Sequence, residues 1–232
     1  MRNAQKWIIV RIDGKIAGVS TDYRVFAKIT KYLATVSNSE RGNVRQTNED
    51  RTIIYNEVSA IAVGLDEVLK LKEDIKWDDL LLFGTDFQKK VWRKLWDLTH
   101  SNSGTSPEKI GGKGNKEDNG NENKEDNTKE SRKTERLCSY SDFAELCENR
   151  AGVRAVAHAI GLNPVSVLIP CHLVVPKESI DRIREIQRKA ESTIFKGEDL
   201  CLNSILADNA IDFGEYSLGK ELKRKLIMHE LA

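Results

Sequence analysis

Residues 139–175 decide the fold of this chain and read SYSDFAELCENRAGVRAVAHAIGLNPVSVLIPCHLVV. Apolar side chains recur at helical spacing over 140–147 and again over 153–161, and the turn Asn149–Gly152 separates the two runs. This pattern predicts two short helices that form either a helix-turn-helix or an ordinary helical hairpin. The spacing alone does not distinguish these two structures.

The second of these helices is predicted to be amphipathic. Its inward stripe is expected to contain Val153, Val156, Ala157 and Ile160, and its outward face Arg154, Ala155 and His158. A long cation, a small residue and a histidine on one exposed face suit the close approach of a helix to a DNA groove.

The following segment, 163–175, carries the candidate for reactivity. Its two prolines leave too little chain between them for a helix, and Pro170 fixes the backbone immediately before Cys171. The thiolate is the nucleophilic form of cysteine, and the imidazole of His172 can accept the thiol proton directly or through a water. A Cys-His dipeptide alone is more often structural, so this interpretation depends on partners elsewhere in the chain.

The C-terminal helix supplies one such partner. Leu222, Leu226 and Glu230 follow each other at i, i+4 and i+8, so Glu230 continues an apolar stripe. An unpaired carboxylate on that stripe would be costly, and His172 is a suitable partner because a histidine needs to be oriented. The alternative is that Glu230, close to the C-terminus, frays into water.

The first part of the chain, residues 1–78, is predicted to be a small α/β domain. A hairpin is expected over 7–19 around the turn Asp13-Gly14, with helices over 24–36 and 57–72 and a strand over 52–55. This domain contains no cysteine, no histidine and no motif associated with chemistry.

The remainder, residues 79–232, is predicted to be a second domain. Thr85 and Gln88 have the spacing of a capping box at the start of a helix. The core stripe of that helix is expected to contain Phe87, Val91, Leu95 and Leu98, with Trp92 and Trp96 beside it.

Two inserts are expected to interrupt this second domain. Residues 101–136 are rich in small polar and charged side chains of mixed sign, which predicts a disordered insert rather than a nucleic-acid-binding tail. The other insert, 177–211, borders the cysteine segment, and the spacing of its apolar residues predicts a helix over 179–195 with Ile180, Ile183, Ile186 and Ala190 on one face. We expect this helix to form a flap, which must move if it covers the cleft.

The composition excludes several classes of protein. A net charge of +1 over 232 residues gives no global electrostatic reason to bind nucleic acid, so any DNA contact must come from a local surface. None of the four cysteines forms a C-x-x-C pair, which argues against a zinc site and against a disulfide framework. No apolar run approaches the ~20 residues of a membrane span. We expect a soluble protein, cytoplasmic in a prokaryote and nuclear in a eukaryote, with no metal and no membrane partner.

A set of motifs in a fixed order resembles the O6-alkylguanine-DNA alkyltransferase family. The motifs are FGTDFQKKVW at 83–92, Ser139-Tyr140, Arg154-Ala-Val156, Asn163-Pro164, Pro170-Cys-His172 and Tyr216-Ser-x-Gly219. They cover residues 79–99, 139–176 and 213–232. The resemblance implies a ribonuclease H-like α/β N-terminal domain and a mostly α C-terminal domain with a helix-turn-helix.

The resemblance also implies roles around the thiol. Cys171 resembles the acceptor that attacks the alkyl carbon on guanine O6. His172 is similar to the family's water-bridged base, Glu230 to the acid that orients this base, and Asn163 to a residue that braces the network. Tyr140 resembles the side chain that helps to rotate the nucleotide out and assists protonation of the departing guanine.

Further positions match the family's contacts with DNA and with the base. Arg154 is similar to the arginine finger that fills the vacated place in the base stack, and Ala155 lies beside it on the same face. Val174 and Ser217 match pocket positions whose backbone groups read the guanine edge, and Tyr216 precedes Ser217 in its motif.

By this resemblance the partner is double-stranded DNA with an alkylated guanine, bound in the minor groove with the base flipped out. The protein would act once, because a thioether product is not hydrolysed. It would act as a monomer and without a cofactor. O4-alkylthymine is a second candidate substrate. Two alternatives remain open from the sequence. One is a non-reactive protein that binds alkylguanine lesions and recruits other repair factors, and the other is a helix-turn-helix regulator with a structural cysteine.

The chain departs from the family pattern at two positions near the site. The family's Pro-Cys-His-Arg-Val is Pro-Cys-His-Leu-Val here, so Leu173 replaces an arginine that would support the loop. Ala157 replaces a glycine that is usual in the recognition helix.

Overall fold

The computed structural model describes residues 6–25, 27, 29, 57–100, 136–191, 205, 208 and 210–231. The chain forms two compact units: Met1–Trp92 with Leu162–Ile169, and Arg93–Gly161 with Pro170–Ala232. The expected boundary between two domains at residue 78 stays a prediction. Several predicted segments lie outside the described residues. They are the strand over 52–55, most of the helix over 24–36, the insert up to residue 135, and all but a few positions in the C-terminal part of the second insert.

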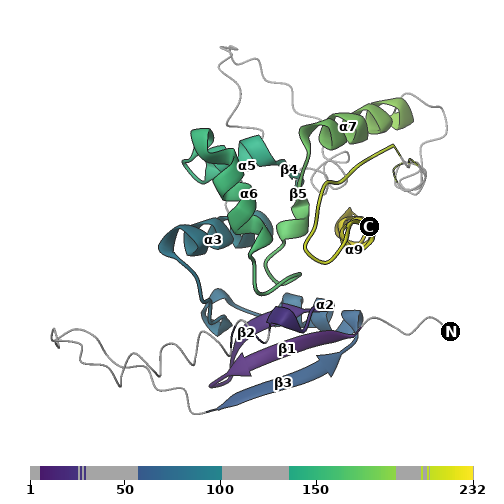
Figure 1. The fold of residues 1–232 in the computed structure, drawn as a ribbon. Helices are drawn as coiled ribbons and strands as arrows, with labels where there is room; N and C mark the ends of the chain where they lie inside the picture. The colour runs from purple at the N-terminus through teal and green to yellow at the C-terminus, as the bar shows by residue number, and fades with distance from the viewer. Residues whose placement is uncertain are drawn as a thin grey trace, which may run out of the picture. The chain divides into compact units, whose positions relative to one another are not determined.

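The first unit is built on a three-stranded antiparallel sheet with the strand order β2-β1-β3 (Figure 1). Strands β1 (Trp7–Ile12) and β2 (Lys15–Ser20) form the predicted hairpin. Asp13 and Gly14 both have positive φ, 47° and 78°, as a two-residue hairpin turn requires. Strand β3 (Val58–Val63) pairs with the other edge of β1, with Trp7 opposite Val63.

The predicted helix over 57–72 is wrong in its first half. Residues 58–63 form β3, Gly64 ends the strand, and helix α2 covers Leu65–Asp74. The apolar spacing suited a helix, but the free edge of β1 pairs with this β-branched run along its whole length, and such pairing overrides a weak helical pattern. The carboxylate of Glu67 accepts a hydrogen bond from the backbone N–H of Gly64 at 2.6 Å and so fixes the start of α2.

The loop Leu162–Ile169 belongs to this first unit. The backbone N–H of Val19 donates to the carbonyl of Pro164, and the N–H of Ser166 donates to the carbonyl of Val19, both at 2.9 Å. These hydrogen bonds hold the loop against strand β2. Along the chain, the loop leads to Pro170 and Cys171.

Helix α3 (Asp86–His100) begins at the predicted capping box. The N–H of Thr85 donates to Gln88 Oε1 at 2.9 Å, and the N–H of Gln88 donates to Thr85 Oγ1 at 3.2 Å. The predicted stripe is buried at Val91 and Leu95, and both tryptophans beside it are buried too. Phe87 is 37% exposed, so the stripe does not extend into the first turn of the helix.

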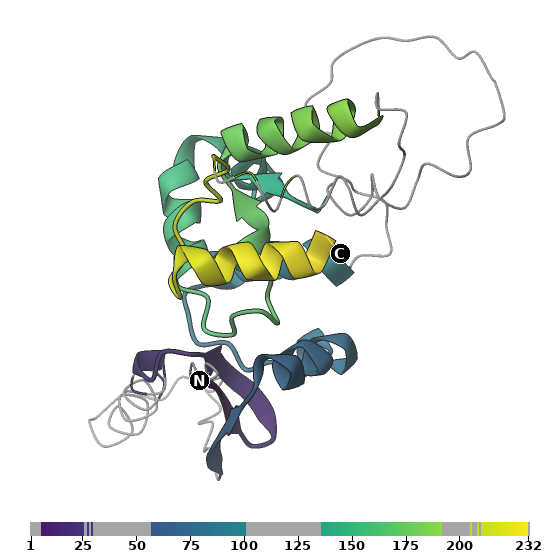
Figure 2. The ribbon, with the colours of Figure 1, turned by 90° about the vertical axis from the view of Figure 1, so that its right-hand side faces the viewer.

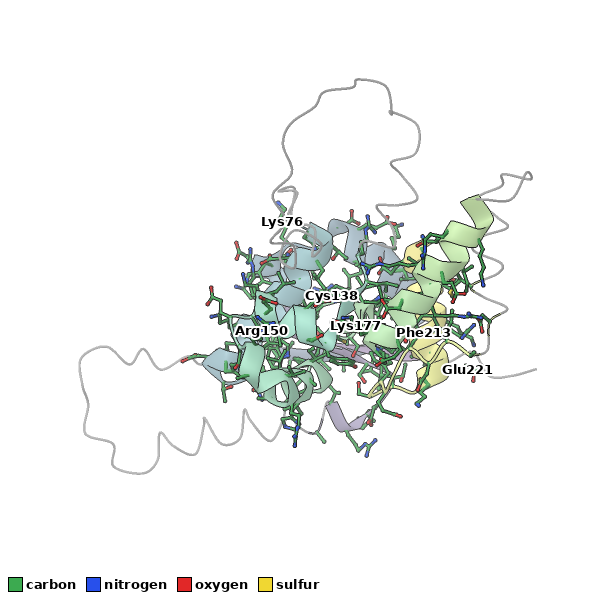
Figure 3. The ribbon with its side chains drawn as sticks, turned by 90° about the horizontal axis from the view of Figure 1, so that it is seen from above. Lys76, Cys138, Arg150, Lys177, Phe213 and Glu221 are labelled. Atoms are coloured by element: carbon green, nitrogen blue, oxygen red, sulfur yellow. The ribbon has the colours of Figure 1, made fainter. Side chains whose placement is uncertain are left out.

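The second unit combines helices with a two-stranded parallel pair. Its elements are β4 (Cys138–Ser139), α5 (Tyr140–Leu146), the 3-10 turns η3 (Arg150–Gly152) and η4 (Cys171–Leu173), α6 (Val153–Gly161), β5 (Val174–Val175), α7 (Lys177–Glu191) and α9 (Lys220–Leu231). The β4–β5 pair lies between α7 and α9 in two perpendicular views (Figures 1 and 2). Viewed from above, Cys138 lies on this pair and Phe213 on the segment that leads into α9 (Figure 3).

One apolar cluster joins η4, β5, α7 and α9 with the segments that precede β4 and α9. It contains Leu137, Leu173, Val175, Ile180, Ile183, Ile205, Ile211, Phe213, Ile227, Met228 and Leu231. The predicted helix in the second insert is therefore present as α7, but its apolar face packs into the core of the unit. Leu137 and Cys138, which directly follow the predicted insert over 101–136, are buried.

Helix α6 has the predicted extent and α5 ends one residue before the predicted end, at Leu146. Helix α6 differs from expectation in its buried face. Val156, Ala159 and Ile160 are buried, whereas Val153 and Ala157 are half-buried. No helix among the described residues has the length and apolar character needed to cross a membrane.

Candidate active site

The thiol of Cys171 sits at the start of a tight turn. Pro170 precedes it with φ −81° and ψ 57°, and η4 follows, closed by a hydrogen bond of 3.0 Å from the N–H of Leu173 to the carbonyl of Pro170. All three residues of η4 are buried, and Cys171 is 4% exposed. The proline and the turn together fix the position of the sulfur atom.

The loop before this turn is held by Asn163. Its side-chain N–H donates to the carbonyl of Ile169 at 2.9 Å, and its Oδ1 accepts from the N–H of Val165 at 3.1 Å. Val167 in this loop has φ 75°, a left-handed conformation that a β-branched residue rarely adopts. Asn163 thus hydrogen-bonds to the backbone at both ends of a strained turn, within the first unit; its assignment as a brace for the cysteine site stays a prediction.

Cys171 lines a pocket of about 560 Å³ in the second unit. The pocket brings together three other predicted residues, Tyr140, Tyr216 and Ser217; its remaining lining residues are Ala157, Ile160, Gly161, Pro176, Gly214 and Glu215. The Cys171 thiol donates to the hydroxyl oxygen of Tyr216 at 3.9 Å. The pocket volume falls in the range that accommodates small ligands.

Tyr140 is held in its neutral form. Burial raises the pKa of its hydroxyl, and negative charge on Cys171 and Glu215 raises that pKa further. At neutral pH the side chain therefore keeps its proton and can donate it within the pocket.

The predicted pair of His172 and Glu230 is present. His172 Nε2 lies 3.2 Å from Glu230 Oε1, and the side chains are 0% and 8% exposed. Glu230 therefore lies on the buried side of α9 rather than in water. Since an ionised carboxylate only accepts hydrogen bonds, this contact requires the proton on Nε2, which leaves the lone pair of the neutral ring on Nδ1.

Lys223 is a charged residue of this site that sequence reasoning missed. It is 1% exposed, and its ammonium donates to the carbonyl of Val174 at 2.8 Å and to that of Glu215 at 3.4 Å. The ammonium also lies 5.7 Å from the centre of the Tyr140 ring. The spacing 223, 226 and 230 would have revealed it, because it places Lys223 on the same helical face as Glu230.

The electrostatics of Lys223 reflect two opposing effects. Burial lowers its pKa from 10.5 to about 8, while negative charge on Cys171, Asp212 and Glu215 acts to raise it. The amine is thus poised between charged and neutral near physiological pH, and its positive form favours a thiolate at Cys171.

The other predicted contact residues lie outside the pocket lining. Arg154, Ala155 and His158 are exposed on α6, as expected. Val174 is fully buried and is not among the residues that line the pocket; its carbonyl accepts the hydrogen bond from Lys223 instead. In this structure Val174 therefore contributes to the support of the pocket.

Leu173 is fully buried in the apolar cluster. Its neighbours there include Ile180 and Ile183 of α7. At the position where the family pattern has an arginine, this chain therefore has an apolar side chain in apolar surroundings. The described part of the chain contains no group of three or more His, Cys, Asp or Glu side chains that could hold a metal ion.

Comparison with known proteins identifies the region around the site. Residues 133–192 match the family model "6-O-methylguanine DNA methyltransferase, DNA binding domain". A "probable methylated-DNA–protein-cysteine methyltransferase" of Acanthamoeba polyphaga mimivirus is 31% identical over 101 residues, which are 44% of this chain and 45% of that protein. The inducible methylated-DNA–protein-cysteine methyltransferase of Bacillus subtilis (strain 168) is 54% identical over 39 residues, 17% of this chain and 22% of its own.

The matched regions are limited in extent. The chain spans less than half the length of these curated relatives. Among solved structures, O6-methylguanine-DNA methyltransferase from the archaeon Pyrococcus kodakaraensis KOD1 aligns over 97% of this chain and 91% of its own, with a TM-score of 0.41 and 18% identity.

Proposed function

We propose that this chain is a methylated-DNA–protein-cysteine methyltransferase. The premise is that residues 133–192 carry the DNA-binding domain of the 6-O-methylguanine DNA methyltransferase family. It repairs DNA by moving the alkyl group of O6-alkylguanine irreversibly to Cys171. One observation carries the proposal: the Cys171 thiol opens into a pocket that it shares with Tyr140, Tyr216 and Ser217.

The reaction is an in-line displacement at the alkyl carbon. His172, oriented by Glu230, accepts the thiol proton through a water, and the positive charge of Lys223 favours the thiolate that results. The sulfur forms a bond to the alkyl carbon as the bond from that carbon to guanine O6 breaks. Tyr140 donates a proton to the departing guanine and regains one from the His172 imidazolium. The net result is that the proton lost by the thiol is replaced by one gained by the guanine.

The DNA side of the reaction uses α5, η3 and α6 as a helix-turn-helix in the minor groove. The exposed Arg154 acts as the finger that replaces the extrahelical nucleotide, and Ala155 allows close approach. Flipping is required because guanine O6 is inaccessible inside a duplex. In this proposal the first unit is the ribonuclease H-like domain of the family, Asn163 braces the cysteine loop, and the protein acts as a monomer.

The product limits each molecule to one event. A thioether is stable to water, and the proposed reaction needs no cofactor to supply or remove the alkyl group. The protein is therefore consumed by its own reaction. O4-alkylthymine in the same pocket is a second substrate to test.

The proposal is tested by incubating the protein with duplex DNA that carries one labelled O6-methylguanine. Mass analysis of the peptide containing Cys171 is expected to show a gain of one methylene. Cys171→Ser should abolish the gain, and Cys147→Ser, a buried cysteine outside the pocket lining, should preserve it. Binding to the DNA without any mass gain would identify a non-reactive lesion binder, and the absence of both binding and transfer would exclude the family function.

A further inference from the structure

A charged residue outside the pocket contacts the acid that orients the base. Arg136 Nη1 lies 3.7 Å from Glu230 Oε2, while the other oxygen of the same carboxylate faces His172 Nε2 at 3.2 Å. Arg136 is 45% exposed, whereas Glu230 is 8% exposed. A cation at the surface thus reaches the buried carboxylate at the oxygen that does not face the histidine.

We propose that Arg136 is a positioning residue of this site, which keeps the Glu230 carboxylate ionised and directed at His172. The inference rests on the proposed function, since it concerns how the base beside Cys171 is prepared. Arg136 falls inside the region that the sequence predicted to be a disordered insert, so the composition of that region concealed it.

Several charged residues on the described helices α7 and α9 are engaged with other groups. On α9, Lys223 donates to the carbonyls of Val174 and Glu215, and Arg224 donates to those of Ile205, Asp208 and Ile211. On the same helix, His229 is exposed and Lys225 pairs with Glu221. On α7, the charged residues Arg182, Glu185 and Lys189 pair with one another and with Asp208, and its packed face is apolar. Arg136 supplies positive charge to the Glu230 carboxylate from the segment before β4.

A buried carboxylate that loses a neighbouring cation takes up a proton more readily. A protonated Glu230 could donate to the imidazole and so favour the other tautomer, which removes the basic lone pair from Nδ1. Loss of Arg136 also removes a positive charge that disfavours the imidazolium form of His172. Both effects act in the same direction, because each makes neutral, correctly oriented His172 available only at higher pH.

The test measures thiol reactivity without DNA. The rate at which iodoacetamide alkylates Cys171 is followed from pH 5 to pH 9 for the wild type, Arg136→Ala, Arg136→Lys and Arg182→Ala. Arg182 is a matched control, since it is 44% exposed and forms a shorter ion pair with Asp208, at 2.8 Å. We expect Arg136→Ala to move the acid side of the profile up by about 0.5 pH unit, a two- to five-fold loss of rate there, given the strength of half-exposed ion pairs.

The outcomes separate this inference from the proposed function. Arg136→Lys should restore most of the wild-type profile, and Arg182→Ala should leave it unchanged. A profile for Arg136→Ala that coincides with that of the wild type would overturn the inference, even if methyl transfer from DNA is normal. A shifted profile in a protein that takes no methyl group from DNA would support the positioning role and refute the proposed repair function.

Discussion

At the scale of single residues, the site is defined by how charge is arranged around one sulfur atom. Negative charge on Cys171 acts to raise the pKa of both Tyr140 and Lys223. His172, which follows Cys171 in the chain, contacts Glu230. Lys223 is the unusual member, because lysine side chains are rarely as little as 1% exposed. Its two backbone acceptors join β5 to the segment before α9.

Lys223 gives a prediction for stability as a function of pH. Its folded pKa of about 8 lies below the unfolded value of 10.5, so between these values the unfolded chain binds more protons and stability rises with pH. The substitution Lys223→Met removes this pH-dependent contribution to the free energy of unfolding. The free energy of unfolding of the wild type, minus that of the variant, should increase by ~3 kcal/mol between pH 7 and pH 10.5. Urea unfolding at several pH values measures it, and a difference that does not change with pH would contradict the account.

The other cysteines give a second prediction at this scale. Burial raises the pKa of the Cys138 thiol to about 12, so at pH 8 it is almost entirely protonated. Peptide mapping after brief treatment with iodoacetamide at pH 8 should therefore find label on Cys171 and none on Cys138. Label on Cys138 at a comparable rate would mean that burial does not protect this thiol.

At the scale of elements, η4 and α7 depend on each other. Leu173 of η4 and Ile183 of α7 are both essentially inaccessible in one apolar cluster, although α7 was expected to be a flap. The substitution of leucine for the family's arginine fits this environment. An arginine would have to place its charge among the apolar side chains of this cluster.

This dependence predicts that restoring the family residue harms the protein. Leu173→Arg should lower the free energy of unfolding by about 3 kcal/mol or more, because it buries an unpaired charge. Leu173→Met, which conserves volume and polarity, should cost less than about 1.5 kcal/mol. Chemical denaturation compares the three proteins, and an arginine variant as stable as the wild type would show that the loop can release this side chain to water.

At the scale of the whole molecule, local signals in the sequence predicted local structure well. The Asp13-Gly14 turn, the capping box at Thr85 and the extents of α5 and α6 each depend on a few adjacent residues. The i, i+4, i+8 stripe of α9 favoured a buried Glu230 over one that frays into water, and its side chain is 8% exposed. These signals need no knowledge of what lies opposite in space.

Features that depend on distant segments were beyond the sequence. Residues 58–63 are a strand because β1 offers a free edge, and the apolar face of α7 is buried because η4 and α9 offer apolar surfaces. Arg136 was missed because it lies in a stretch whose composition is typical of a loop, and Lys223 was missed although its spacing places it on the same face of α9 as Glu230. Both gain significance only when their partners, Val174 and Glu230, are brought to them by the fold.

The central claim is that Cys171 accepts one alkyl group and then stops. The most direct measurement counts the methyl groups transferred from O6-methylguanine DNA in large molar excess, as a function of time. The account predicts a rapid rise to a plateau of one methyl group per protein chain, with all of it on Cys171. A count that continues to rise past one per chain, or that stays at zero while the DNA is bound, would contradict it.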